Sequence, residues 1–179
     1  MENKIQKMVH ASLFLALAYL LPFLTGQIPA IGAMLCPMHL PVLICGFLCG
    51  PVYGLAVGLI VPLFRSLTLG APPLFPTAVC MTFELATYGA VAGIMHRILP
   101  KRRAFVYLSL VSAMIVGRIV WGTASFIAYG CTGQSFTLAA FFTAAIVNAL
   151  PGIILQLIIV PILVNLIENS ARFKQGKII

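Results

Sequence analysis

Six long apolar segments, joined by short connections, dominate the sequence and limit the folds that it can adopt. They cover about residues 5–25, 36–49, 52–69, 77–98, 105–129 and 138–167. Hydrophobic residues make up 61% of the chain and charged residues only 8%, and the mean hydropathy is +1.10, a composition unlike that of a soluble domain. A membrane-spanning helix needs about 20 apolar residues. We therefore expect an all-α integral membrane protein, in which residues 1–179 form a single compact bundle of six transmembrane helices.

Two of the six segments depart from the usual length of a span. The second, residues 36–49, is short, so we expect it to be tilted or to be completed by the loop before it. The sixth, residues 138–167, is long and is interrupted by Pro151 and Pro161. Connections around residues 26–36 and 70–76 are rich in glycine or proline and carry no charge.

Basic residues predict how the bundle lies in the membrane. With six spans, nine of them fall on the side of the N-terminus and none falls in the loops on the other side: Lys4, Lys7, Arg97, Lys101, Arg102, Arg103, Arg172, Lys174 and Lys177. The positive-inside rule then places both termini in the cytoplasm. The net charge of +8 does not indicate a nucleic-acid partner, because these residues lie at segment ends and form no basic aromatic stripe.

Glycine pairs at a spacing of four residues predict close packing between helices. Such pairs let membrane helices approach closely, where lipid and protein neighbours are equally apolar. Three GxxxG pairs occur, at Gly46 and Gly50, Gly54 and Gly58, and Gly89 and Gly93.

Three ionisable residues lie inside apolar segments and mark a candidate site. Arg65, Glu84 and Arg118 fall in the third, fourth and fifth segments, where a charge is costly and therefore indicates function. At about 1.5 Å per residue, all three reach the outer half of the membrane, and Asn148 of the sixth segment reaches a similar depth. We expect these four side chains to line one pocket.

Neighbouring side chains extend this candidate site. Tyr88 follows Glu84 by four residues and Trp121 follows Arg118 by three, so each pair shares a helix face. His39, in the run PMHLP, borders the apolar loop that could close over a cavity, although a lone histidine there is more often a packing residue. The alternative is an ion pair that only joins helices. That pair leaves one arginine unpaired, which is costly, whereas an anionic ligand would balance it.

Enzymatic chemistry finds little support in the sequence. The chain has no GxxxxGK[ST], HExxH or GxSxG motif and no aspartate, so we expect neither an enzyme nor a bound cofactor. A metal site at Cys36, His39, Cys45 and Cys49 is conceivable, but structural zinc sites have tighter paired spacing. We expect these cysteines to pack as small apolar residues, with no disulfide framework.

The run GAMLCPMHLPVLICGFLCGPVYGLAVGLIVPLFRSL, after a lysine-bearing N-terminus and an apolar first loop, resembles the substrate-binding S components of energy-coupling factor (ECF) vitamin transporters. The resemblance implies a high-affinity vitamin-binding subunit in a prokaryotic plasma membrane. It implies as partners a transmembrane coupling protein and two ATPases, with toppling of the subunit carrying the vitamin across. The family's AxxxA-like docking motif on the first helix corresponds here to Ser12 and Ala16.

The runs PMHLP and FELATYG are most similar to pantothenate-type members of that family. Pantothenate carries a carboxylate that Arg65 or Arg118 could bind in bidentate fashion. Riboflavin is the alternative vitamin, because Trp121, Tyr88 and Phe83 could pack on a flat ring, but a neutral ligand leaves the extra positive charge unexplained. A hypothesis of another class is a membrane scaffold subunit whose charges only join helices.

Overall fold

The structure is a computed structural model that describes residues 4–25, 34–100, 102–133 and 137–176. Within these ranges the chain is helical and contains no strand. In chain order the elements are α1 (Lys4–Leu20), η1 (Leu21–Thr25), α3 (His39–Cys49), α4 (Pro51–Leu69), η2 (Leu74–Ala78), α5 (Val79–Ile98), α6 (Arg103–Cys131), α7 (Leu138–Phe142), η3 (Thr143–Asn148) and α8 (Leu150–Gly176). The predicted all-α class is confirmed.

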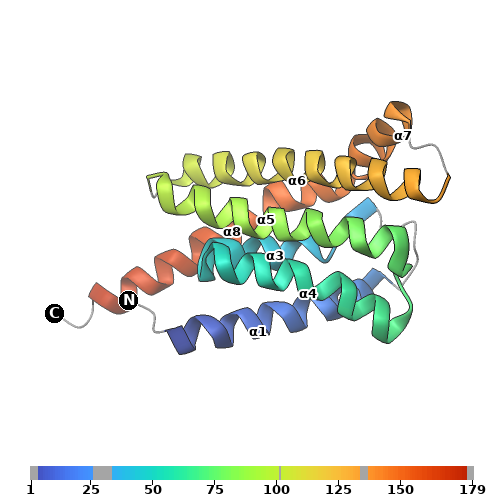
Figure 1. Cartoon of the computed structure of the whole chain (residues 1–179). Helices are drawn as coiled ribbons and strands as arrows, with labels where there is room; N and C mark the ends of the chain where they lie inside the picture. The colour runs from blue at the N-terminus through green and yellow to red at the C-terminus, as the bar shows by residue number, and fades with distance from the viewer. Residues whose placement is uncertain (1–3, 26–33, 101, 134–136, 177–179) are drawn as a thin grey trace.

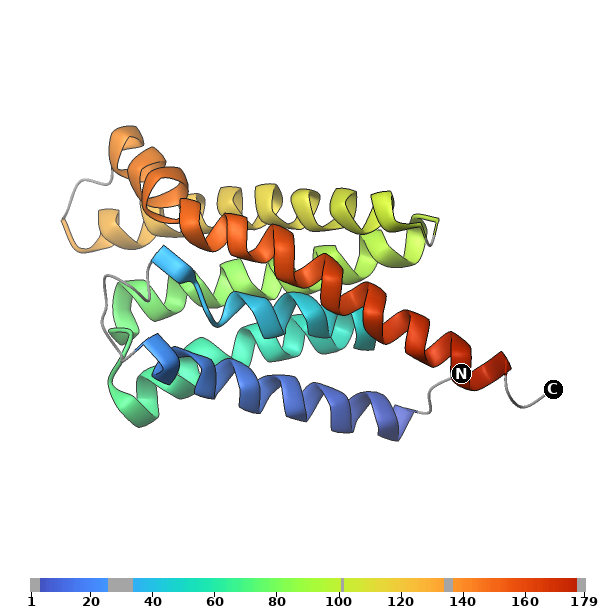
Figure 2. The same ribbon diagram turned by 180° about the vertical axis from the view of Figure 1, so that it is seen from behind.

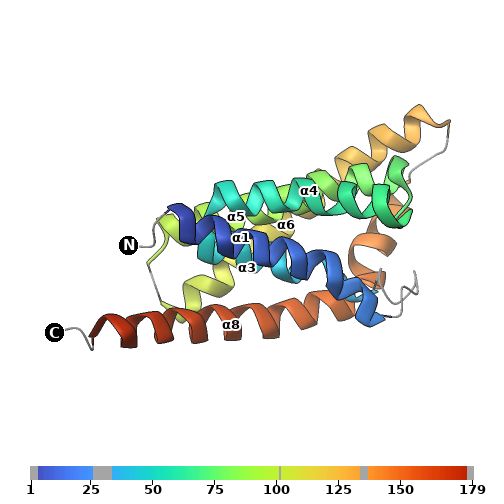
Figure 3. The same cartoon turned by 90° about the horizontal axis from the view of Figure 1, so that it is seen from below.

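The long helices lie side by side along one direction (Figure 1). Both chain ends and the turn between α5 and α6 lie at the same end of the bundle, and the end of α4 and the start of α5 lie at the opposite end (Figures 1 and 2). Seen from below, α3 lies between α1 and α8 (Figure 3), and it contacts both of them. The arrangement therefore puts the shortest of these helices at the centre.

Among the residues that the structure describes, five helical stretches are long and apolar enough to cross a membrane: Lys4–Leu24, Pro51–Leu69, Leu74–Ile98, Arg103–Cys131 and Leu150–Asn169. These correspond to five of the six predicted spans. The remaining segment, α3, has 11 residues, ten of which are buried, so at about 1.5 Å per residue it is only about 17 Å long. The predicted short second segment is thus a buried central helix preceded by irregular chain, and six full-length spans are not what the helix lengths show.

The sixth predicted segment is divided in the structure. Its first part forms α7 and the π-helical turn η3, and α8 begins only at Leu150. Pro151 follows directly, in the first turn of α8, where proline is tolerated because its missing N–H would have no partner within the helix. Pro161, by contrast, lies within α8.

Glycines bring α3, α4 and α5 into backbone contact, as the GxxxG pairs predict. A Cβ on Gly54 would lie 2.7 Å from the Gly46 Cα and from the Gly89 carbonyl oxygen, and a Cβ on Gly93 would lie 2.7 Å from the Pro51 Cα. Any larger residue at these positions would push the helices apart. The packing prediction is confirmed for Gly46, Gly54, Gly58, Gly89 and Gly93. Gly50 differs, because an added Cβ there would meet nothing within 4 Å, and its φ of 103° serves the turn between α3 and α4.

Candidate functional site

A buried ion pair joins α5 to α6 near the middle of the bundle. Glu84 lies in the second turn of α5, and its Oε1 is 2.9 Å from Nη1 of Arg118 on α6. The Glu84 side chain is 2% exposed and that of Arg118 is 16% exposed. Each charge thus has an opposite charge beside it, which is the condition for keeping charges inside a membrane helix bundle.

Two further side chains close around this carboxylate. His39, the first residue of α3, places Nε2 3.5 Å from the same Glu84 oxygen, farther than a normal hydrogen bond. Tyr88 lies one turn after Glu84 on α5 and packs against the His39 imidazole with ring centroids 5.2 Å apart. The Tyr88 ring can lie against α6 only because residue 117 is glycine, since a Cβ there would overlap the ring.

Cys36 is a member of the site that sequence reasoning assigned only to packing. Its Sγ lies 4.0 Å from Nη2 of Arg118, and its carbonyl accepts a hydrogen bond from the His39 N–H at 3.0 Å. The Cys36 side chain is buried, with 8% of its surface exposed. Its φ of 47° is left-handed, which is uncommon for a residue with a side chain. No sequence signal marks that conformation.

An apolar cavity of about 350 Å³ opens beside the ion pair. Arg118 and Tyr88 line it together with side chains of α6, α7, η3 and α8, among them Met114, Phe141, Ile153 and Leu157. Trp121 stacks on Phe141 with ring centroids 6.0 Å apart, and the Arg118 guanidinium carbon lies 5.9 Å from the indole. The site therefore joins a charged cluster to an apolar chamber, the usual composition of a small-molecule pocket.

Polar atoms without a well-directed hydrogen bond concentrate in this region. In the described part of the chain, buried atoms of this kind occur on five residues: His39 (Nδ1 and Nε2), Glu84 (Oε1), Tyr88 (Oη), Arg118 (Nε) and Gln156 (Oε1). Buried polar groups are nearly always hydrogen-bonded, and the exceptions require an explanation. Four of the five belong to the cluster around Glu84, so a bound polar molecule is the simplest one.

A family model for the substrate-specific component of ECF transporters matches residues 6–164. The chain belongs to this family. No curated protein and no solved structure matches it. Members are substrate-binding transporter subunits and not enzymes, and they work with an ECF module of transmembrane and ATPase subunits. This substrate-specific component is accordingly a multi-pass membrane protein that binds a small molecule.

The structure brings together five of the seven predicted binding residues, His39, Glu84, Tyr88, Arg118 and Trp121. The other two lie elsewhere. Arg65 donates a hydrogen bond to the Tyr19 carbonyl at 2.8 Å and packs on the Phe23 ring, 5.0 Å from its centroid. Asn148 is an exposed residue at the end of η3. Their binding roles stay predictions, but the contacts of Arg65 are with α1 and η1.

Ser12 and Ala16, the predicted docking residues of this component, lie on an exposed face of α1. Large apolar side chains surround them on that face, including Val9 (61% exposed) and Leu13 (56% exposed), while Ala11 and Ala18 face the bundle. The face is thus open to a neighbouring helix, and the small residues would let that helix approach closely.

In the described ranges no group of three or more His, Cys, Asp or Glu side chains is placed to hold a metal ion. Cys45 and Cys49 lie in the core between α1, α3 and α4. Cys36, as described above, faces Arg118 instead. The conceivable metal set from the sequence is therefore divided between two environments.

Proposed function

We propose that this substrate-specific component binds a small water-soluble vitamin, with pantothenate as the first candidate, at the cluster around Glu84 and Arg118. The observation that supports this most is the group of buried polar atoms without a well-directed hydrogen bond, which lies beside an apolar cavity. A ligand with polar groups at one end and an aliphatic part would satisfy the cluster and fill the chamber at the same time.

The donors and acceptors of the cluster suit pantothenate. This vitamin carries a carboxylate, an amide and two hydroxyls. Arg118 uses Nη1 on Glu84 and Nη2 on Cys36, which leaves its buried Nε to donate to a ligand oxygen. Glu84, Tyr88 and His39 offer acceptors or donors to ligand hydroxyls.

The position of Arg65 removes the excess positive charge that the sequence predicted at the site. Because Arg65 contacts α1 and η1, the cluster holds one arginine and one glutamate, so their charges cancel. An incoming carboxylate would therefore share Arg118 with Glu84, and the Arg118 Nε is the buried donor left for it.

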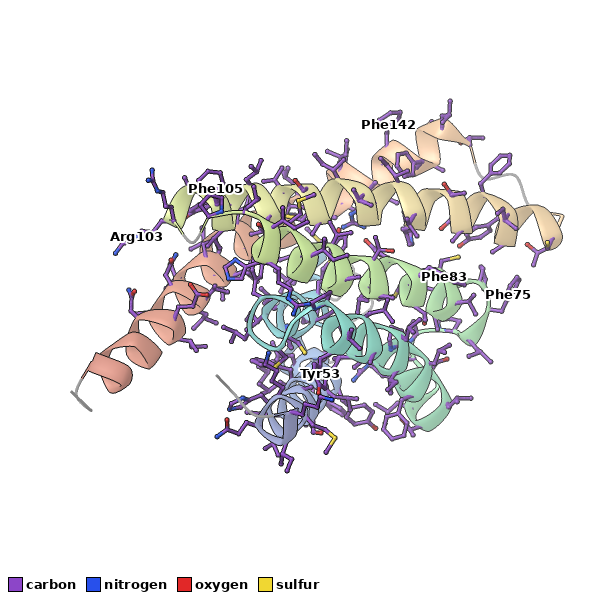
Figure 4. The ribbon with its side chains drawn as sticks, turned by 60° about the vertical axis from the view of Figure 1, so that its left-hand side comes forward. Tyr53, Phe75, Phe83, Arg103, Phe105 and Phe142 are labelled. Atoms are coloured by element: carbon purple, nitrogen blue, oxygen red, sulfur yellow. The ribbon has the colours of Figure 1, made fainter. Side chains whose placement is uncertain are left out.

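Riboflavin remains the alternative vitamin, and the aromatic residues favour it less than the sequence suggests. Phe83 is 51% exposed and lines a different groove, with Phe75, on the outer side of α5 and α6 (Figure 4). Tyr88 is fully buried against His39. Trp121 already stacks on Phe141. These three aromatic side chains do not face one another across a slot.

We propose that the chain crosses the membrane of a prokaryotic cell six times, with both termini in the cytoplasm. In this arrangement α3 makes the second and shortest pass, and residues 1–179 form one transmembrane domain. The two termini and the α5–α6 turn lie at the same end of the bundle (Figure 1). This supports the arrangement, because the basic residues expected on the cytoplasmic side occur in the sequence near the termini and in the connection between α5 and α6. The family of substrate-binding subunits argues against the scaffold hypothesis.

Native mass spectrometry of protein purified from cells would test the proposed substrate. We expect the mass of one pantothenate on a fraction of the molecules, and loss of that mass in an Arg118→Met variant. A co-purified molecule of another class, or one retained equally by the variant, would contradict the assignment.

A further inference from the structure

One glutamine lies within the apolar face that α8 turns toward the bundle. Gly152, Gln156, Val160 and Val164 follow at intervals of four residues, so they share one side of the helix. All four are buried, and Gln156 is only 1% exposed. Because α8 contacts α3, this side chain is held inside the bundle and away from lipid.

Packing at Gly152 sets the position of Gln156 along the axis of the bundle. A Cβ on Gly152 would lie 2.6 Å from the Met34 carbonyl oxygen and 2.9 Å from the Leu35 carbonyl carbon, so α8 touches the chain that leads into α3. Both helices then run in the same direction (Figures 1 and 2). One turn further along, Gln156 reaches the level at which α3 begins, and His39 is its first residue.

The helix also places Gln156 beside the apolar cavity. It follows Ile153 by three residues and precedes Leu157 directly, and both of these line the cavity together with Tyr88 and Arg118. Gln156 is thus a neighbour of Ile153 and Leu157 on the surface of α8 and is buried more deeply than they are.

The amide oxygen of Gln156 has no hydrogen-bond partner in the described part of the chain. A buried amide oxygen without a hydrogen-bond donor destabilises an apolar interior, and methionine or leucine would avoid that cost. We propose that Gln156 is the substrate contact supplied by α8: its amide oxygen accepts a hydrogen bond from a hydroxyl or N–H group of the ligand held at Arg118 and Glu84. This rests on the proposed vitamin-binding function and requires a ligand with a donor at that point.

A Gln156→Met variant tests the contact, because methionine keeps the length of the side chain and removes the amide. The matched control is Asn165→Leu on the same helix, since the Asn165 amide already donates to the Pro161 carbonyl at 2.7 Å. Binding of pantothenate to the full-length protein is measured by calorimetry, and melting is measured without ligand. We expect Gln156→Met to raise the dissociation constant roughly 3- to 10-fold, with a ligand-free melting temperature equal to or above that of the wild type, and the control to bind as the wild type does.

An unchanged dissociation constant with a lower ligand-free melting temperature would overturn the proposal, because it would show an amide that only joins helices. A wild type that binds riboflavin and not pantothenate contradicts the proposed substrate alone, and the same comparison is then made with riboflavin. If neither vitamin binds, the ligand-free melting temperatures are compared. A Gln156→Met protein that melts below the Asn165→Leu control overturns the contact. A Gln156→Met protein that melts at or above the wild-type temperature supports it.

Discussion

Removal of Arg118 is expected to cost both stability and binding, and a second substitution separates the two effects. In an Arg118→Met variant the Glu84 carboxylate, 2% exposed, keeps only His39 at 3.5 Å as a neighbour that can carry positive charge. In an Arg118→Met/Glu84→Gln double variant no charge of the pair remains. Both methionine and glutamine approximate the volumes that they replace, so packing changes little.

The size of the stability effect follows from the burial of the pair. Breaking a buried ion pair by removing one partner costs about 3–5 kcal/mol. We take the lower value, about 3 kcal/mol, because Arg118 is 16% exposed and His39 can compensate in part. For a chain of this length that corresponds to a fall in melting temperature of roughly 6–12 °C. The double variant should melt within roughly 4 °C of the wild type, because replacing both partners of a buried pair is often nearly neutral.

Melting in detergent and ligand binding are measured on the wild type, the two single variants and the double variant. The only tryptophan of the chain, Trp121, lies 5.9 Å from the Arg118 guanidinium, so its fluorescence reports ligand binding without a label. We expect the double variant to recover stability and not binding. A double variant that melts at the sum of the two single losses would refute the pairing, and one that regains binding would refute the role of Arg118 in holding substrate.

Three further variants test other parts of the structure. Gly117→Ala should displace the Tyr88 ring, lower the melting temperature by a few degrees and weaken binding. Gly130→Ala on the same helix has open space and should change neither melting nor binding, so equal behaviour of the two variants would contradict the contact between Gly117 and Tyr88. Arg65→Met should lower stability by about 1–3 kcal/mol through loss of its hydrogen bond to α1 and leave the dissociation constant within about twofold, so a large loss of vitamin binding would restore its predicted role in the pocket. Ala16→Leu should reduce co-purification of the transmembrane coupling subunit while vitamin binding stays unchanged, and undiminished assembly would exclude this face of α1 as the docking surface.

Helix boundaries were the most predictable part of this protein. Apolar length, proline and glycine positions gave segments such as 52–69 and 105–129, which differ by a few residues from α4 and α6. These signals are local, since a membrane helix satisfies its own backbone hydrogen bonds. The break before α8 was harder to predict, because a proline can stand in the first turn of a helix, as Pro151 does, or lie inside a helix, as Pro161 does.

Depth and sign predicted that Glu84 could pair with one of the two arginines but left open which one. The structure pairs it with Arg118 and places Arg65 elsewhere. Counting residues along a helix gives the level of a side chain, but it does not give the direction in which the helix turns that side chain. Arg65 comes from a similar predicted depth and points to the Tyr19 carbonyl. The direction depends on how α4 packs on α1, which is a tertiary property.

The contributions of Cys36 and Gln156 also depended on tertiary structure. Cys36 reaches Arg118 through a left-handed backbone conformation that its sequence does not mark. Gln156 was recognisable as polar in an apolar segment, but only the packing of Gly152 on residues 34 and 35 sets its level beside α3. Sequence therefore indicated the chemistry of the site, and helix packing selected which side chains form it.

Calorimetric titration of pantothenate into the purified wild-type protein tests the central claim most directly. We expect the wild type to bind one ligand per chain with a dissociation constant below about 1 μM, equivalent to a binding free energy more favourable than about −8 kcal/mol. We expect no measurable binding by the stable Arg118→Met/Glu84→Gln variant. Equal binding by the wild type and this variant, or no heat with pantothenate under conditions in which another vitamin binds, would contradict the claim.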